Sequence, residues 1–204
     1  MKFIKWKSLI ISCIVCLLPI LLGLSFWDSL PDQMAIHFNI NNEADNFASK
    51  EFAVFALPVL MAVTQIFCSV VNDIASYKHS TPPKMRMITT WLIPVMSLVL
   101  QTVTIGYSLG WNIDIRKIVM LIIAAIFLAI GNYLPKLDYV KNTKTDKETA
   151  QKINRFAGFE MVIMGLLALI TLFLPPVAST IWIFLIIPYL ILLFIYTKKM
   201  TKEK

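Results

Sequence analysis

Residues 52–72 read FAVFALPVLMAVTQIFCSVVN, and this stretch decides the fold. It contains no Asp, Glu, Lys or Arg, and its most polar side chains are the amides of Gln65 and Asn72. A run of about 20 apolar residues is long enough to cross the hydrocarbon core of a bilayer as a helix. A strand or loop at that depth would leave its backbone groups without hydrogen-bond partners. The stretch therefore predicts a membrane-spanning helix.

Five further runs of the same kind lie on either side of this one. The six predicted spanning helices cover residues 8–27, 52–72, 88–109, 118–135, 156–174 and 180–197. Hydrophobic residues make up 58% of the chain and charged residues 15%, against about 45–50% and about 25% in soluble domains. We therefore expect an all-α integral membrane protein, in which residues 1–204 form one six-helix bundle embedded in the lipid bilayer.

The basic residues predict the orientation of these helices. Sixteen of the 19 Lys and Arg residues lie on the side that holds both termini, and the other three are Lys50, Arg116 and Lys117. Because basic residues gather in cytoplasmic loops, this asymmetry predicts cytoplasmic N- and C-termini. The predicted topology has an outer loop at 28–51 and an inner loop at 136–155. The excess of basic residues in cytoplasmic loops also explains the net charge of +7 without nucleic-acid binding.

Catalytic motifs are missing from the sequence. The two histidines, His37 and His79, fall in loops predicted on opposite sides of the membrane, and no hydrolase, zinc or phosphate-binding motif is present. Cys13 and Cys16 form a C-x-x-C, but both lie within an apolar run, where thiols stay protonated and unreactive. We expect a protein that is not an enzyme, with no metal and no cofactor.

One carboxylate falls inside a predicted span. Glu160 lies about one turn into the fifth helix, and Asn132 approaches the same level from the fourth. Charged groups at membrane depth are costly and often mark ion, proton or ligand sites. The competing interpretation is that Glu160 reaches the interface and pairs with Lys152 or Arg155. Both interpretations stay open on the sequence alone.

Two prolines have a glutamine at the same spacing. Gln65 follows Pro58 by seven residues, and Gln101 follows Pro94 by seven, in helices predicted to run in opposite directions. This pattern resembles a weak inverted repeat of the kind found in transporters. A chance coincidence is the simpler alternative.

The inner loop carries a helix-start signal. Residues 145–148 read TDKE, a capping box, and predict a short surface helix over 145–153.

The outer loop is longer than a connector needs to be, and long loops are often functional. It contains His37, Phe38, Asn39 and Asp45 in a largely polar stretch, and its aromatic rings are suited to the headgroup layer. We expect these four residues to contact a ligand at the outer face.

The motifs of the two halves resemble those of the SdpI family of bacterial membrane proteins. They are LPDQMAIHFN at 30–39, NEAD at 42–45, Ser49-Lys50, GNYLPK at 131–136 and NRFAG at 154–158. Members of that family are immunity proteins against a secreted peptide toxin, and some hold a transcriptional regulator at the membrane. The resemblance implies a multi-pass protein of the bacterial cytoplasmic (inner) membrane. It also implies non-catalytic binding of a bacteriocin-like peptide at the outer face. Between the fourth and fifth helices the chain departs from the family pattern and reads DYVKNTKT at 138–145, which places a signalling role in question.

Two other functions remain open. One is a small ion-coupled transporter with Glu160 in its pathway. The other is a membrane sensor that recruits a cytoplasmic transcriptional regulator through residues 136–155.

Overall fold

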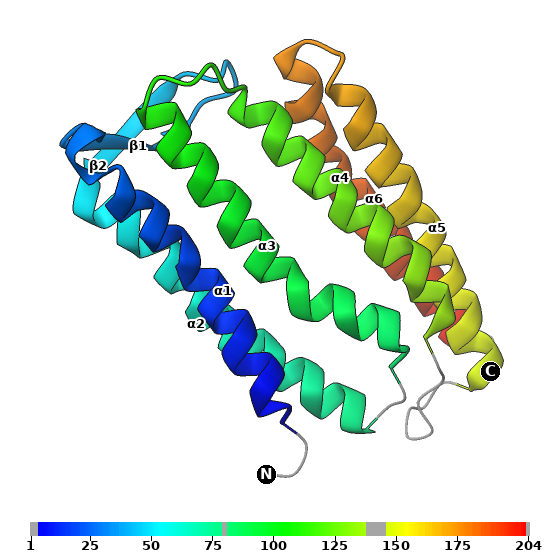
Figure 1. Ribbon diagram of the computed structural model, residues 1–204. Coiled ribbons are helices and arrows are strands. Elements are labelled where there is room, and N and C mark those ends of the chain that lie inside the picture. The colour runs from blue at the N-terminus through cyan, green and yellow to red at the C-terminus, as the bar shows by residue number, and fades with distance from the viewer. Residues whose placement is uncertain (1–3, 79–80, 138–145, 203–204) are drawn as a thin grey trace. The chain divides into compact units, whose positions relative to one another are not determined.

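The computed structural model describes residues 4–78, 81–137 and 146–202 (Figure 1). Six of its helices are long and apolar enough to cross a membrane, which confirms the predicted six-helix membrane architecture. They are α1 (Trp6–Ser25), α2 (Lys50–Lys78), α3 (Pro83–Ser108), α4 (Ile115–Tyr133), α5 (Lys147–Thr171) and α6 (Pro176–Lys202). The orientation of the termini stays a prediction.

The fifth helix begins at Lys147, not at residue 156, because the predicted surface helix and the predicted span are one continuous helix. Its N-cap is Asp146, whose Oδ1 accepts from the Thr149 amide at 2.9 Å. Thr145 lies outside the described residues. Hydropathy identifies the part of a helix that lies in lipid, whereas backbone hydrogen bonding continues into the polar flanks. For the same reason α2 runs to Lys78 and α3 starts at Pro83.

The outer loop contains a β-hairpin that the sequence analysis did not predict. Strand β1 (Gln33–Phe38) pairs antiparallel with β2 (Ala44–Ser49), and Gln33 lies opposite Ser49. A short 3₁₀ turn, Trp27–Ser29, joins α1 to the hairpin, and a second one, Leu134–Lys136, follows α4.

The chain divides into two compact units. The first contains residues 1–77 and 89–115, and the second contains 78–88 and 116–204. The single six-helix bundle expected from the sequence stays a prediction.

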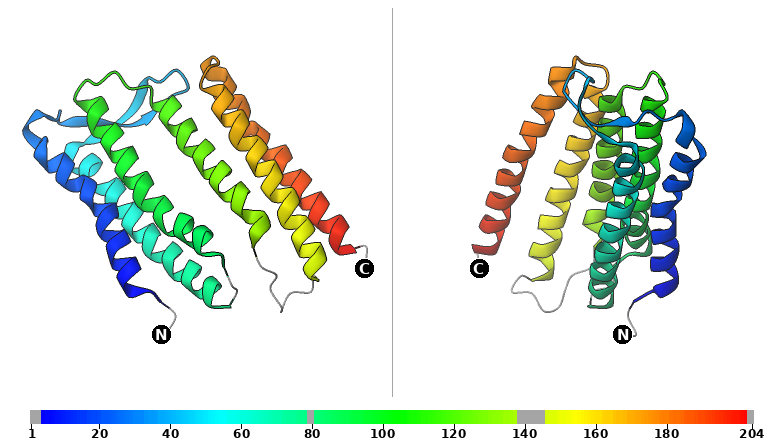
Figure 2. Two further views of the ribbon diagram at one scale, coloured as in Figure 1. Left: turned by 45° about the vertical axis from the view of Figure 1, so that its right-hand side comes forward. Right: turned by 90° about the vertical axis from the view of Figure 1, so that its left-hand side faces the viewer.

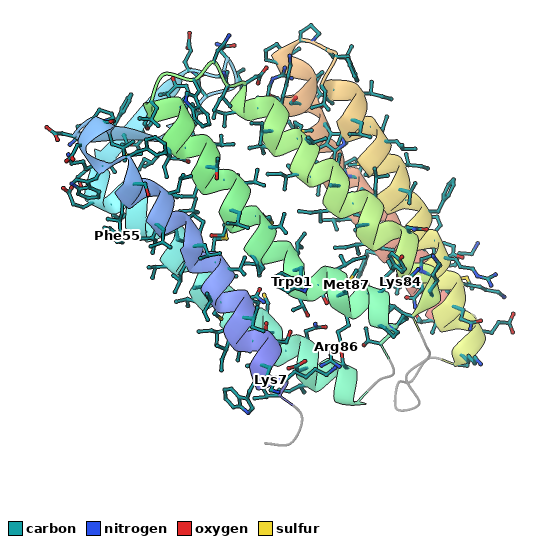
Figure 3. The ribbon with its side chains drawn as sticks, viewed as in Figure 1. Lys7, Phe55, Lys84, Arg86, Met87 and Trp91 are labelled. Atoms are coloured by element: carbon teal, nitrogen blue, oxygen red, sulfur yellow. The ribbon has the colours of Figure 1, made fainter. Side chains whose placement is uncertain are left out.

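In the first unit, α1, α2 and most of α3 run side by side, and the hairpin covers one end of them (Figures 1 and 2). Figure 3 shows Phe55 on α2 near that end and Lys7 near the opposite end of α1. An apolar cluster lies beneath the hairpin and includes Leu30, Met34 and Ile105.

A glutamine from α3 stabilises the proline kink in α2. Pro58 has no amide hydrogen, so the carbonyl of Val54 one turn earlier loses its partner within the helix. Gln101 donates from Nε2 to the Ala53 carbonyl oxygen at 2.9 Å and to the Val54 carbonyl oxygen at 3.4 Å. The side chain thus supplies the donor that the proline lacks.

The reverse contact stabilises the kink in α3. Pro94 frees the carbonyl of Thr90, and Gln65 from α2 donates to it from Nε2 at 3.0 Å. Each of the two helices therefore supplies the donor that the proline of the other lacks. The shared seven-residue spacing has a packing explanation, which requires neither a transporter repeat nor chance.

The second unit holds α4, α5 and α6 side by side (Figure 2). The backbones of α4 and α5 approach each other closely at two glycines. A Cβ atom added to Gly158 would lie only 2.6 Å from the Gly131 carbonyl oxygen. The same Cβ would lie 2.7 Å from Pro135. The motifs at 131–136 and 154–158 are thus the two sides of one helix contact. Small residues at such contacts let membrane helices pack closely.

Trp182 joins α6 to this unit. Its ring is buried, its Nε1 donates to the Met164 carbonyl oxygen at 2.9 Å, and it packs edge-on against Phe127 of α4.

Candidate functional site

The hairpin is irregular, and the irregularity decides which side chains it exposes. Ile36 on β1 and Asp45 on β2 are extra residues at two shifts in the strand register. Such bulges reverse which face the following side chains occupy. Met34 and Ala35, which precede the first shift, are both buried, whereas Ile36 and Phe47 are exposed.

His37 and Asp45 face each other across the hairpin. The His37 Nδ1 and the Asp45 Oδ1 lie 2.5 Å apart, and the side chains are 66% and 42% exposed. Even a full ion pair that is exposed to this extent contributes only about 0–1 kcal/mol to stability. Folding therefore gains little from the pair, and both groups remain open to a ligand.

Asn39 and Phe38 have structural roles that the sequence analysis did not foresee. The Asn39 Oδ1 accepts from the amides of Asn41 at 2.9 Å and Glu43 at 3.1 Å, and its Nδ2 donates to the Glu43 carboxylate. This arrangement folds the turn. Phe38 packs edge-on against Tyr107 of α3, with ring centroids 4.7 Å apart. Their predicted contact with a ligand stays a prediction.

Asn42 anchors the hairpin at the candidate site, and the sequence analysis did not identify it. It has a φ of 66°, a conformation that Asn tolerates better than most residues. Its Nδ2 donates to the Ile113 carbonyl oxygen at 3.1 Å, and its Oδ1 accepts from the Ile115 amide at 2.7 Å. The hairpin tip is thereby fixed to the connection after α3. The adjacent Asn41 and Asn42 at the tip were the available signal, because Asn is frequent in tight turns.

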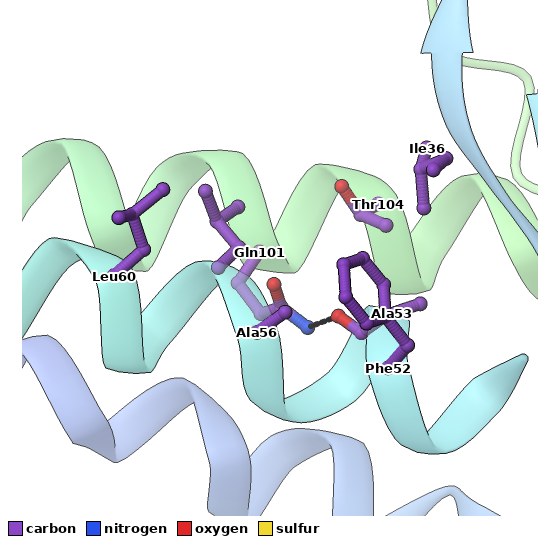
Figure 4. Close-up of a pocket in the computed structure, with 8 residues that line it drawn as sticks. Ile36, Phe52, Ala53, Ala56, Leu60, Gln101 and Thr104 are labelled. Atoms are coloured by element: carbon purple, nitrogen blue, oxygen red, sulfur yellow. Dashed lines mark hydrogen bonds between the residues drawn. The ribbon is translucent and has the colours of Figure 1, made fainter. Parts of the chain in front are cut away.

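A cavity of about 260 Å³ lies between α2 and α3, next to β1 (Figure 4). It is lined by Ile36, Phe52, Ala53, Ala56, Leu57, Leu60, Gln101 and Thr104. Gln101 is fully buried, and its Oε1 has no hydrogen-bond partner in the described part of the chain. The cavity is apolar with one free acceptor.

Glu160 lines a separate cavity of about 200 Å³ in the second unit, between α5 and α6. Its Oε2 is buried and lacks a partner among residues 4–78, 81–137 and 146–202. Lys152, one of its two proposed partners, pairs with Glu148 at 2.7 Å. Asn132 is exposed, and no hydrogen bond joins it to Glu160 within the described ranges. The structure therefore does not bring these two predicted residues together, and Tyr189 of α6 shares the cavity instead.

No group of three or more His, Cys, Asp or Glu side chains among the described residues could hold a metal ion. Cys13, Cys16 and Cys68 are free thiols. His79 lies outside the described residues.

Comparison with known proteins adds two findings. Residues 14–62 match the family model of a domain of unknown function, DUF1648. The chain is also 26% identical over 195 residues to the immunity protein SdpI of Bacillus subtilis (strain 168), which covers 91% of this chain and 92% of that protein. The chain is thus similar to an SdpI-type membrane protein over nearly its whole length. No solved structure matches the chain.

The matched domain of this chain contains most of the site. Residues 14–62 include much of α1, the whole hairpin and the first part of α2. Six of the eight residues that line the 260 Å³ cavity fall within it, and the other two, Gln101 and Thr104, belong to α3.

Proposed function

We propose that this protein protects a bacterial cell against a membrane-active peptide toxin, by binding the peptide without catalysis at the hairpin end of the first unit. The name of the Bacillus subtilis relative, an immunity protein, supports this function. The predicted positive-inside orientation supports an outward-facing hairpin in the cytoplasmic membrane.

The proposal rests mainly on the hairpin, which is anchored to the rest of the unit and yet exposed. Asn42 and Phe38 hold it against the rest of the unit, so it is no loose connector. It nevertheless exposes Ile36, Ile40 and Phe47, which is unfavourable in water unless lipid or a partner covers them.

The charge of this end suits a cationic amphipathic peptide. Residues 28–51 contain five acidic side chains and one Lys, which pairs with Asp32 at 3.3 Å. A cationic peptide that approaches the membrane is attracted over about 8–10 Å. It then meets apolar and acidic groups side by side, which match its two faces.

The test compares the removal of two exposed side-chain pairs in a toxin-sensitive strain. His37→Ala with Asp45→Ala should reduce the protective effect at least about tenfold, because charged contacts within an interface often contribute more than 1 kcal/mol. Glu148→Ala with Lys152→Ala also removes an exposed pair, far along the chain from the hairpin, and should leave protection unchanged. Equal protection by both double variants, at equal membrane levels, would refute recognition by the hairpin.

Ion-coupled transport is the second candidate, because Glu160 has an unpartnered, buried carboxylate oxygen in a cavity. Transport requires a titratable group there, so Glu160→Gln should abolish the phenotype while the protein stays in the membrane. Full activity of the Gln variant removes this candidate. The sensor hypothesis rests on a loop whose residues 138–145 lie outside the described part, and it stays a prediction.

A further inference from the structure

The side chains that line the cavity at the hairpin end determine which chemical groups it can bind. Its walls are Ala, Leu, Ile and Phe side chains with two polar residues, Gln101 and Thr104. The Thr104 hydroxyl donates its proton to the Leu100 carbonyl oxygen at 3.0 Å within its own helix. The Gln101 amide hydrogens are directed at α2 carbonyls. The cavity therefore offers acceptors and no free donor.

The orientation of the Gln101 amide follows from its contacts. The nitrogen must face the Ala53 carbonyl oxygen, since two oxygens cannot form a hydrogen bond. The oxygen is consequently turned away from that carbonyl, among the lining side chains, as Figure 4 shows. A buried acceptor without a partner costs about 1–3 kcal/mol. A ligand that brings a donor to this point recovers that cost.

The size of the cavity limits the ligand. Drug-sized molecules occupy about 300–1,000 Å³, and a cavity of about 150 Å³ takes benzene. A volume of about 260 Å³ lies between these and suits one two-ring side chain.

Chemistry narrows the choice among apolar occupants. A lipid acyl chain or a Phe ring would fill the space and leave the Gln101 oxygen without a donor. A Lys or Arg head group would be buried without a countercharge, because no carboxylate lines the cavity. An indole has an apolar body and a single N–H donor at its edge.

We propose that this cavity binds a tryptophan side chain of the peptide toxin, whose indole N–H donates to the Gln101 Oε1. The toxin as source rests on the proposed function, whereas the preference for an indole rests on the cavity alone. The exposed Ile36 and Phe52 lie at the same cavity and would contact the neighbouring peptide residues.

The experiment uses the full chain in lipid nanodiscs and two probes, 5-fluoroindole and its N-methylated form, followed by fluorine NMR. We expect saturable binding of 5-fluoroindole and at least fivefold weaker binding of the N-methyl probe, since methylation removes the donor. Ala56→Leu fills the cavity and should abolish binding. Ala75→Leu, a matched change farther along α2, should not.

Equal binding of the two probes would mean a generic apolar pocket and would overturn the proposal. Binding that survives Ala56→Leu, or no saturable binding at all, would overturn it too. These readouts need no toxin, so their failure leaves the immunity function standing. Conversely, a parent chain that binds indole but protects no sensitive strain defeats the immunity function only. If the parent protects, Ala56→Leu should lower protection, and full protection by this variant would exclude the toxin as the source of the indole.

Discussion

The reciprocal contacts between glutamines and prolines predict a specific pattern of energetic coupling between α2 and α3. Replacing Gln101 by Leu keeps a side chain of similar size and removes the donor to the Ala53 and Val54 carbonyl oxygens. The loss of a donor to a buried carbonyl costs about 1–3 kcal/mol, but removal of the unpartnered Oε1 offsets part of this. We therefore expect Gln101→Leu to lower the free energy of unfolding by about 1–2 kcal/mol.

Pro58→Ala restores the missing amide hydrogen, so Val54 regains a partner within its helix. In that background Gln101→Leu should cost less, with a coupling of about 0.6–1.7 kcal/mol, the range of hydrogen bonds between membrane helices. Gln65 and Pro94 should show the same coupling.

The controls are the pairs on a single helix. Pro58 with Gln65, and Pro94 with Gln101, make no reciprocal contact, so their effects should add within about 0.5 kcal/mol. The assay is reversible unfolding in mixed micelles, followed by circular dichroism and analysed as double-mutant cycles. Equal coupling in same-helix and cross-helix pairs would refute the reasoning.

Three other changes test separate parts of the structure. In a cysteine-free background, Asp45→Cys should react with an impermeant maleimide in whole cells and Thr143→Cys only after lysis; the reverse labelling would overturn the orientation. Asn42→Ala should lower the unfolding free energy by about 1–2 kcal/mol and accelerate amide exchange in the hairpin, since it removes two hydrogen bonds and disfavours the positive φ. Unchanged exchange would contradict its anchoring role. Gly158→Leu should cost at least about 2 kcal/mol in micelle unfolding because it separates two backbones, whereas the exposed Phe159→Leu should cost less than about 0.5 kcal/mol. Similar losses for both would contradict the close helix contact.

The spanning helices were predictable because hydropathy over about 20 residues reports the lipid environment directly. The hairpin was not, because its two bulges break the alternation by which a half-buried strand is recognised. Met34 and Ala35 are consecutive in sequence and both buried, a pattern that does not indicate a strand.

The candidate site was predictable in part. His37 and Asp45 were identified from their residue types, and the structure brings them into contact. Gln101 was identified by its spacing from Pro94. Its contact with α2 depends on how the two antiparallel helices align, which hydropathy and residue spacing do not reveal. Tyr189 was missed as a neighbour of Glu160 for the same reason.

The exchange of donors between α2 and α3 also has a consequence for membrane insertion. Either helix alone would enter lipid with a free carbonyl, Val54 in α2 or Thr90 in α3, and each such group costs several kcal/mol in hydrocarbon. The cost falls when the two helices meet, because Gln101 donates to the Val54 carbonyl oxygen and Gln65 donates to that of Thr90. They are joined by a short connection between Lys78 and Pro83. The two helices should thus leave the insertion machinery as a pair, and α2 made without α3 should insert less completely than its hydropathy predicts.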